Sequence, residues 1–338
     1  MFISSSSVAD VECGKAIYHP YVISGNGRPA FLSHPTPLSL QLLRHHDDRY
    51  WTAVSQQYYS SSDTNSVAIS ESNTRKARII NGENAVFGEA PWVVSIKFRT
   101  SNNHFCGGTI INMRYVLSAS HCFGGVLRGL FSVNMIKATV GEYNESAEEW
   151  PVEAVDVGIE SIIFHHDFKL RDYVNDIALL RLERDLEWGL LVFGQPICLS
   201  DSNEIVDDDE KETERMKATV YGWGQAVDFH DGINYYPEVL QKVSVPILSN
   251  TECAKWFRRQ NSKWSPGDGH LCAGYKRGMK DSCQGDSGSP LVLYRIGRRQ
   301  PAVVGIVIAG SGCGKPGYPG IYTNVPAYID WIKSKISD

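Results

Sequence analysis

The sequence predicts an all-β domain, a barrel or sandwich of short antiparallel strands, that starts near residue 79 and ends in a helix. Two observations carry this prediction. After residue 78 the chain consists of short runs rich in Val, Ile, Thr and Tyr, which Gly, Pro, Asn and Asp separate. Before residue 78 the composition differs, and the polar stretch 54–74 is typical of an exposed linker.

The leader, residues 1–78, holds one cysteine and scattered apolar side chains, too few to predict an independent core. We therefore expect a poorly structured leader over 1–78 and a folded domain over 79–338. The clearest runs of strand composition in that domain are Trp92–Phe98, Thr109–Leu117, Ile177–Leu182, Ala218–Tyr221 and Val303–Ile308.

The C-terminal segment Pro326–Ile336 is the one helix that the pattern predicts. Its apolar residues Tyr328, Ile329, Ile332 and Ile336 recur at helical spacing and would share one face. We expect that face to pack onto the last strands of the domain.

The overall composition limits the class of protein. Of the 338 residues, 42% are hydrophobic and 21% charged, which fits a globular domain and excludes a wholly disordered or coiled-coil chain. No run of 18 apolar residues occurs, and no secretory signal can be read in the first ten residues. The formal charge of −5 gives no case for nucleic-acid binding, and much of the acidity lies in one stretch, Asp201–Arg215, interpreted as a solvated loop rather than a cation or partner site.

The cysteine count points to disulfides. Eight cysteines occur, with no Cys-x-x-Cys and no paired Cys/His spacing that would indicate zinc. Disulfides form in oxidising compartments, so we expect a secreted or cell-surface protein. Spacing alone leaves 105 possible pairings open. The cysteines are Cys13, Cys106, Cys122, Cys198, Cys253, Cys272, Cys283 and Cys313.

Three separate segments carry residues of nucleophilic catalysis. Ser287 stands in Gly285-Asp286-Ser287-Gly288, where glycines allow a sharp turn that leaves the serine hydroxyl accessible. His121 follows one predicted strand, and Asp176 begins another. The chain order histidine, aspartate, serine is that of the chymotrypsin-like triad and differs from the subtilisin and α/β-hydrolase orders.

At these residues the sequence closely resembles the trypsin/chymotrypsin family of serine proteases, from Ile79 to about Lys335. The resemblance implies a double six-stranded antiparallel β-barrel with the triad in the cleft between the barrels. It rests on the ordered segments Arg78–Gly82, His104–Gly108, Leu117–Cys122, Asn175–Leu180, Tyr221–Gly224, Asp281–Pro290 and Pro319–Thr323.

The resemblance also implies roles for these residues. His121 would take the proton of the Ser287 hydroxyl and later donate it to the leaving amine, while Asp176 fixes the imidazole tautomer. The N–H groups of Gly285 and Ser287 would form the oxyanion hole.

Cysteine pairing is likewise implied by the family. The pairs would be Cys106 with Cys122, Cys253 with Cys272, Cys283 with Cys313, and Cys198 with Cys13 in the leader. A further family disulfide would join the positions that Ala218 and Leu293 occupy here, and both of its cysteines are missing together.

Substrate preference follows from Asp281, six residues before Ser287, where trypsin-like members keep a carboxylate at the base of the primary pocket. Gly310 and Gly320 match the small residues that keep this pocket open, so cleavage after Arg or Lys is expected. The chain departs from the family at Ile308-Ala309-Gly310, where Ser-Trp-Gly is usual. This change removes a hydroxyl that supports the aspartate and an indole that walls the neighbouring subsites.

The resemblance also implies latency. Cleavage at Arg78–Ile79, by another trypsin-like protease or by the enzyme itself, would free an amine that pairs with Asp286. We expect a monomer that acts on protein or peptide substrates, with no nucleic-acid partner, no membrane span, no cofactor and no metal.

Weaker signals remain beside these. Asn144 begins an Asn-Glu-Ser glycosylation acceptor. The carboxylates of 142–153 lie where some trypsins bind calcium, but we interpret them as a solvated acidic loop. The pair His165-His166, beside Asp167, is interpreted as structural.

Two other functions stay open. A catalytically weak homologue with a binding or regulatory role is suggested by Ile308-Ala309, although the intact triad argues against it. A lipase or esterase is disfavoured by the order of the triad and by the lack of alternating strands and crossover helices.

Overall fold

The computed structural model describes residue 13 and residues 21–23, 29–31, 82–130, 132–146, 154–186, 195–200, 216–227, 234–294 and 300–336. The chain divides into two compact units, one of residues 1–17 with 77–338 and one of residues 18–76. In the smaller unit, β1 (Tyr21–Ile23) pairs antiparallel with β2 (Pro29–Phe31). The expectation of a poorly structured leader falls mostly outside the described residues.

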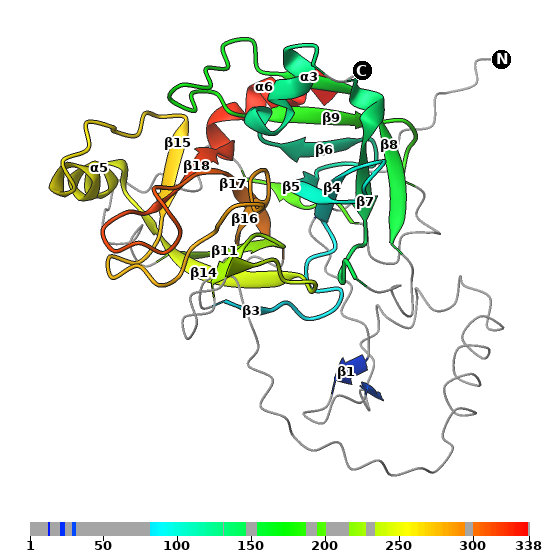
Figure 1. The fold of residues 1–338 in the computed structure, drawn as a ribbon, viewed down its shortest axis with the longest axis horizontal. Helices are drawn as coiled ribbons and strands as arrows, with labels where there is room; N and C mark the ends of the chain where they lie inside the picture. Colours follow the sequence, from blue (N-terminus) through cyan, green and yellow to red (C-terminus); the bar gives the residue numbers. More distant parts are fainter. Residues whose placement is uncertain are drawn as a thin grey trace, which may run out of the picture. The chain divides into compact units, whose positions relative to one another are not determined.

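The first half of the larger unit is a closed six-stranded barrel whose neighbouring strands are all antiparallel (Figure 1). Its interior is lined by β-branched and leucine side chains such as Ile96, Ile110 and Leu180, which are fully buried. In order round the barrel the strands are β4 (Val93–Phe98), β5 (His104–Ile110), β6 (Tyr115–Ser118), β9 (Ala178–Leu182), β8 (Val155–Phe164) and β7 (Ile136–Val140).

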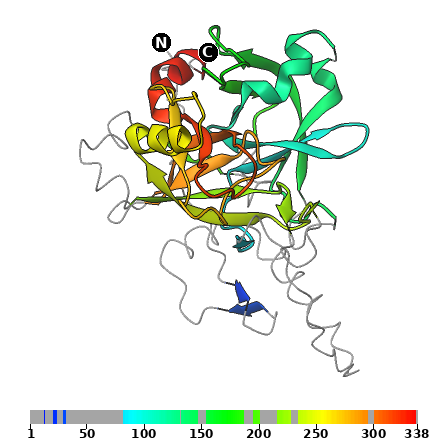
Figure 2. The same ribbon diagram turned by 60° about the vertical axis from the view of Figure 1, so that its left-hand side comes forward.

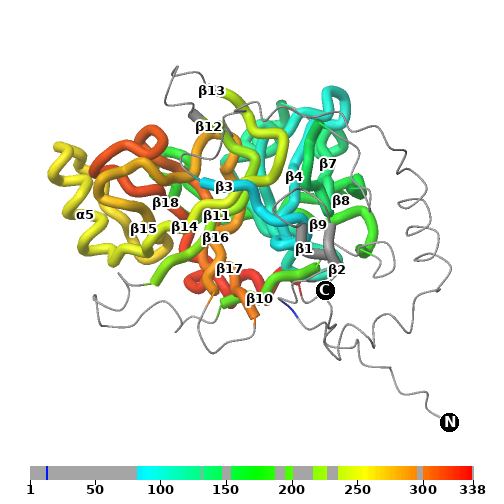
Figure 3. The backbone as a smooth tube through the Cα atoms, turned by 90° about the horizontal axis from the view of Figure 1, so that it is seen from below, coloured from blue at the N-terminus to red at the C-terminus, as the bar shows by residue number. Residues whose placement is uncertain are grey.

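The second half is also a closed antiparallel barrel, because β17 pairs with both β16 and β18. β3 (Glu83–Asn84) extends it beside β14, and β10 (Cys198–Leu199) lies parallel to β17 (Figure 3). In order the six strands are β11 (Lys217–Gly222), β14 (Gln241–Leu248), β15 (His270–Ala273), β18 (Gly320–Asn324), β17 (Ala302–Ala309) and β16 (Pro290–Leu293). The expected double six-stranded barrel is therefore confirmed.

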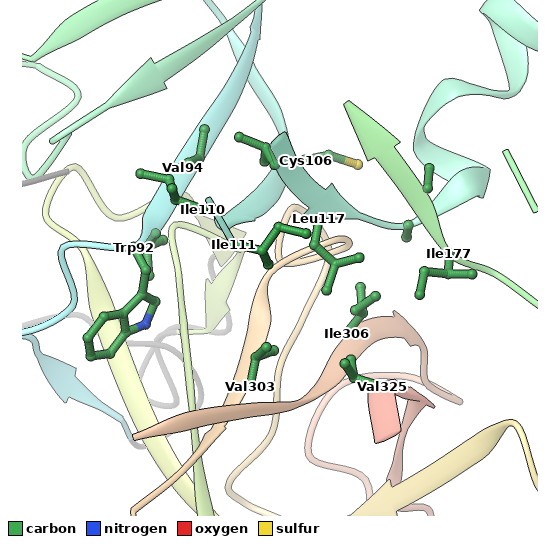
Figure 4. Close-up of a cluster of buried hydrophobic side chains, with 14 of the residues drawn as sticks. Trp92, Val94, Cys106, Ile110, Ile111, Leu117, Ile177, Val303, Ile306 and Val325 are labelled. Atoms are coloured by element: carbon green, nitrogen blue, oxygen red, sulfur yellow. The ribbon is translucent and has the colours of Figure 1, made fainter. Parts of the chain in front are cut away.

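A continuous apolar core joins the two barrels. Leu117 and Ile177 of the first barrel lie in the same cluster as Val303 and Ile306 of the second, with Val325 beside them (Figure 4). Full burial of one such aliphatic side chain stabilises a fold by about 1.5–3 kcal/mol. This shared apolar core holds the two barrels together.

One predicted strand proved to be two. The run Thr109–Leu117 contains the end of β5, a turn and the start of β6, with Thr109 opposite Leu117. The turn forms because the Asn112 carboxamide oxygen accepts hydrogen bonds from the N–H groups of Arg114 and Tyr115. The polar turn residue Asn112 was the signal that the composition argument missed.

Helices occur at the outside of the barrels (Figure 2). The predicted C-terminal helix begins as a 3₁₀ turn, η3 (Val325–Tyr328), and continues as α6 (Ile329–Ile336). The helix α5 (Asn250–Arg259) was not predicted, although the Ser249 side chain caps it by accepting from the Glu252 N–H. Shorter turns are η1 (Ser120–Phe123), α3 (Gly124–Leu127) and η2 (Val133–Met135). In the described part of the chain no helix has the length and apolarity to cross a membrane.

All eight cysteines are joined in disulfides, in the pairs that the family resemblance implies. The bonds are Cys13–Cys198, Cys106–Cys122, Cys253–Cys272 and Cys283–Cys313. Ala218 and Leu293 lie directly opposite each other on β11 and β16, and both are buried. Apolar packing thus fills the place of the missing family disulfide.

The interpretation of the loop after β7 as solvated was wrong for the two carboxylates that the structure describes. The Lys97 ammonium, on β4, is 2.5 Å from Glu142 Oε2 and 3.5 Å from Glu145 Oε1. The side chains of Lys97 and Glu142 are only 3% and 7% exposed. Glu148, Glu149 and Glu153 lie outside the described residues.

A first prediction concerns this buried ion pair. Lys97→Met would leave the Glu142 carboxylate buried without its cation, and we expect the free energy of unfolding to fall by about 3–5 kcal/mol. The double variant Lys97→Met/Glu142→Gln should recover most of the loss, because the deeply buried charge is then gone, and the remaining carboxylate, Glu145, is 21% exposed and accepts from Ser95. Guanidinium unfolding followed by tryptophan fluorescence measures both; a loss below about 1 kcal/mol in the single variant contradicts the assignment.

Candidate active site

The predicted histidine and aspartate are in direct contact. The His121 N–H donates to Asp176 Oδ1 at 2.9 Å, and His121 Nδ1 lies 2.7 Å from Asp176 Oδ2. Asp176 is completely buried, whereas the His121 side chain is 19% exposed. A carboxylate beside Nδ1 keeps the imidazole proton there, so the Nε2 lone pair is free to accept a proton.

The second barrel holds the aspartate in place. Thr323, on β18, donates its hydroxyl to the Asp176 carbonyl at 2.6 Å. Tyr328, in η3, donates to the Asn175 carboxamide oxygen at 2.8 Å. Asn175 has a left-handed backbone, with φ of 54°, and such a conformation persists only where its surroundings fix it.

A histidine that the sequence reasoning missed supports the same segment. His270 Nδ1 accepts from the Gly267 N–H, so its Nε2 carries the proton and donates to the Tyr173 carbonyl at 3.2 Å. Burial lowers the pKa of His270, which agrees with a neutral ring. The Tyr173 ring stands edge-on to His121, with 5.9 Å between ring centroids. His270 also lines an open cavity of about 500 Å³ together with Asn175.

Ser287 lies in a turn that depends on glycine. Gly285 and Gly288 have φ values of 97° and 82°, in the left-handed region that favours glycine. Ser287 is half-buried, and its carbonyl accepts from the Gly107 N–H at 2.7 Å. Within the described part of the chain, the N–H groups of Gly285 and Ser287 donate to no other group.

The strand β5 connects the serine turn to the histidine. Gly107, which binds the Ser287 carbonyl, follows Cys106, and the disulfide from Cys106 leads to Cys122 beside His121. The two sulfurs lie within 4.8 Å of a ring nitrogen of His121. These sulfurs are joined in a disulfide and are not available as metal ligands.

A buried network of hydrogen bonds contacts the backbone of the serine turn at Gly285. His104 Nε2 is 2.8 Å from the Gly285 carbonyl, and His104 Nδ1 is 2.8 Å from Ser95 Oγ. Ser95 in turn donates to Glu145 Oε1 at 2.7 Å. Burial lowers the pKa of His104, and the Glu145 carboxylate acts in the opposite direction. This contact links the Gly285 carbonyl to the buried side chains of the first barrel.

Asp286, next to the nucleophile position, is fully buried. Its carboxylate accepts from the N–H groups of Gly224 and Cys283, each at 2.8 Å. Burial raises the pKa of Asp286 to about 6. No cation contacts it among the described residues, and Ile79, its predicted partner, lies outside them.

Asp281 is a buried carboxylate with few hydrogen-bond donors. It is 3% exposed, and its Oδ2 accepts from the Gly314 N–H at 3.0 Å. Its Oδ1 has no hydrogen-bond partner in the described part of the chain. A Cβ at Gly320 would stand 2.9 Å from this oxygen, so a side chain there would crowd it. Burial raises the pKa of Asp281 to about 7.

The departure from the family pattern is visible at the end of β17. Ile308 is buried and Ala309 half-buried, and Gly310 follows them. In the described residues the Asp176 carboxylate receives its hydrogen bonds from His121 alone. The remaining predicted site residue, Asn144, is half-buried and accepts from both the N–H and the hydroxyl of Ser146.

Comparison with known protein families matches the Trypsin family over residues 79–332. The chain is 36% identical over 261 residues to serine proteinase stubble of Drosophila melanogaster, covering 76% of this chain and 31% of that protein. It is 36% identical over 274 residues to phenoloxidase-activating factor 1 of Holotrichia diomphalia, covering 77% and 70%. It is 35% identical over 268 residues to coagulation factor XI of Bos taurus, covering 77% and 38%.

Three findings together define the class of protein. These are the double barrel, the contact between His121 and Asp176 beside a glycine-flanked serine, and the family match over residues 79–332. The chain belongs to the trypsin family of serine proteases. It spans about a third of the length of stubble and about seven tenths of phenoloxidase-activating factor 1.

A second prediction tests the serine turn with a matched pair of substitutions. Gly288 and Gly312 have almost the same φ, 82° and 83°, so alanine costs about 1–2 kcal/mol of backbone strain at each. A Cβ at Gly288 also collides with the Ser118 hydroxyl and the Gly107 carbonyl, whereas one at Gly312 meets nothing within 4 Å. Chemical unfolding should therefore show a larger loss in Gly288→Ala; equal losses refute the packing described here.

Proposed function

We propose that the protein is a serine endopeptidase that cleaves peptide bonds after Arg or Lys. His121, Asp176 and Ser287 form its catalytic triad in this proposal. The observation that carries it is the double contact between His121 and the buried Asp176, beside a serine turn whose two N–H groups are unoccupied in the described chain.

The geometry supports the following chemistry. His121 Nε2 takes the Ser287 hydroxyl proton as the oxygen attacks the substrate carbonyl carbon, and Asp176 stabilises the imidazolium that forms. The N–H groups of Gly285 and Ser287 bind the oxyanion, and loss of one such donor costs about 3–4 kcal/mol in a comparable hydrolase. His121 then protonates the leaving amine. Water, activated by the same histidine, finally hydrolyses the acyl-serine.

The preference for basic residues rests on Asp281. A buried carboxylate with one unpaired oxygen and a pKa near 7 is stabilised when a guanidinium or ammonium group of the substrate reaches it. Gly320, which leaves this oxygen uncovered, and Gly310 complete the proposed pocket.

A third prediction separates binding from stability at Asp281. Asp281→Asn should lower kcat/KM for Arg and Lys peptide amides by at least about 100-fold, because the cation loses its buried partner. Hydrolysis assays on the activated protein measure this effect. Unchanged selectivity for basic residues refutes the pocket assignment.

The same variant should be more stable than the parent at pH 8. The Asp281 pKa is about 7 in the fold against 3.8 unfolded, so the native state binds the extra proton and stability declines as pH rises through this window. Asparagine resembles the protonated form. We expect a difference of only about 0.6 kcal/mol at pH 4, just above the unfolded pKa, and a gain of up to about 4 kcal/mol at pH 8, since a pKa unit is about 1.4 kcal/mol.

We further propose that the protein is a zymogen activated at Arg78–Ile79, with a leader over 1–78 and a protease domain over 79–338. The buried Asp286 carboxylate has two N–H donors but no cation in the described chain, which suits an incoming Ile79 amine. The Cys13–Cys198 disulfide would keep the leader attached after the cut.

A fourth prediction tests activation in a Ser287→Ala protein, which cannot cleave itself, treated with a trypsin-like protease. Electrophoresis should give one band without reductant and two with it, and the larger fragment should begin at Ile79. Separate chains without reductant would rule out the tether. In the parent protein, Arg78→Gln should abolish activation; full activity of the uncut variant is the contrary result.

The four disulfides favour an oxidising compartment, and we propose that the protein is secreted. Relatives include venom serine protease Bi-VSP of Bombus ignitus, 35% identical over 267 residues. Asn144 is a candidate glycosylation site, and the proposed partners are protein substrates and an activating protease, with the enzyme itself a monomer.

A second candidate function, a weak homologue with a binding or regulatory role, is favoured by Ile308, which offers no hydrogen bond to the Asp176 carboxylate. The activated protein and its Ser287→Ala variant distinguish the two. Hydrolysis of an Arg peptide amide by the first and not by the second supports the enzyme, and equal residual rates support the homologue.

A further inference from the structure

Three adjacent side chains outside the proposed active site bring metal-binding atoms together. The chain leaves β8 and turns through His165, His166 and Asp167, and the Phe168 N–H closes the turn on the His165 carbonyl at 3.0 Å. One ring nitrogen from each histidine and one Asp167 carboxylate oxygen all lie within 4.8 Å of one another. None of the three residues has a part in the proposed mechanism.

The first of these histidines is held in a fixed orientation. The His165 ring packs against Tyr328 and Trp331, with centroid separations of 5.6 and 5.2 Å. The ring of His166 stacks on it at 4.6 Å, with 20° between the planes. Burial, and then the neighbouring His166, lower the pKa of His165. One of its ring nitrogens lies within 4.8 Å of the donor atoms of the other two residues, and a neutral imidazole offers such a nitrogen to a metal.

The other two side chains are free to complete a coordination sphere. His166 Nε2 is 3.0 Å from Asp167 Oδ2, and the two side chains are 76% and 64% exposed. A contact this exposed adds little to stability, so these groups can reorient at low cost. Their backbone is fixed, because Asn175 Nδ2 donates to the Asp167 carbonyl at 3.0 Å.

We propose that His165, His166 and Asp167 form a surface site for a divalent transition metal, with zinc as the reference ion. Two imidazole nitrogens and one carboxylate oxygen are donors that zinc and copper accept, and a water molecule would complete a tetrahedral zinc site. Zinc–ligand bonds are about 2.0–2.2 Å, which the exposed His166 and Asp167 reach by side-chain rotation. Calcium needs six or more oxygen ligands and should not bind here.

Metal binding at this site has a defined proton balance. The Asp167 N–H contacts His165 Nδ1 at 3.3 Å, a long hydrogen bond that favours the proton on Nε2. A metal on Nδ1 replaces this hydrogen bond, whereas a metal on Nε2 requires the proton to move to Nδ1.

Titration calorimetry of the full chain with Zn²⁺ tests the site. The Ser287→Ala protein is used so that the sample cannot digest itself. We expect one zinc site, no heat from Ca²⁺, and affinity at least tenfold weaker in His166→Ala and in Asp167→Ala. Glu183→Gln, an exposed carboxylate change on the same barrel whose partner is Arg99, is the matched control and should keep the parent affinity. Zinc affinity that is unchanged in both His166→Ala and Asp167→Ala overturns the proposal.

Fluorescence gives a second readout that does not depend on catalytic activity. Bound Cu²⁺ quenches nearby indoles, and Trp331 contacts His165. Stoichiometric Cu²⁺ should reduce the emission of the parent, and the reduction should be smaller in Trp331→Phe and in His166→Ala. Equal quenching in all three proteins would place the copper elsewhere and overturn the proposal. If the protein proves not to be a protease, both measurements still decide the metal site.

Discussion

Burial of carboxylates is the constraint on which this active site depends. Asp176, Asp281 and Asp286 are at most 3% exposed, and an isolated charge in such a position is strongly unfavourable. Each of the three is stabilised by N–H donors that the surrounding loops supply, and each stands where the proposed chemistry needs negative charge. The donors are His121 for Asp176, the Gly314 N–H for Asp281, and the N–H groups of Gly224 and Cys283 for Asp286.

The three carboxylates differ in the partners that they have in the described part of the chain. The Asp176 carboxylate receives two hydrogen bonds, both of them from His121. Asp286 and Asp281 receive backbone donors only, and burial raises the pKa of both. In the proposed mechanism the missing charges come from outside the described fold, from the new amino terminus and from the substrate. In this proposal, activation and substrate specificity both depend on a cation that pairs with a buried carboxylate: the Ile79 amine with Asp286, and the substrate side chain with Asp281.

Many of the candidate site residues could be predicted because each lies in a short, recognisable sequence motif. The serine turn, the histidine after a strand and the aspartate before another each have a short sequence signal, and their chain order assigned the class. The contacts that position them could not be read in this way. Thr323 and Tyr328 reach Asp176 and Asn175 across 147 and 153 residues of sequence, and only the closed second barrel brings them there.

Composition predicted the fold class well and the element boundaries less well. It merged β5 and β6 because the turn at Asn112 has few polar residues, and it overlooked α5, whose amphipathic pattern is short. The loop after β7, whose length differs from that of the calcium-binding trypsins, was interpreted as a solvated acidic loop. Its counterion, Lys97, comes from a strand some 45 residues earlier, so local charge counting could not find it.

The long reach of Thr323 and Tyr328 also bears on biosynthesis. A ribosome releases the chain from its amino terminus, and the first barrel is complete in sequence well before η3 emerges. Until then the segment around Asp176 lacks the hydroxyl groups that hold it, whatever the state of the leader. A nascent or truncated chain without β18 and η3 therefore lacks two of the hydrogen bonds that hold the segment of Asn175 and Asp176.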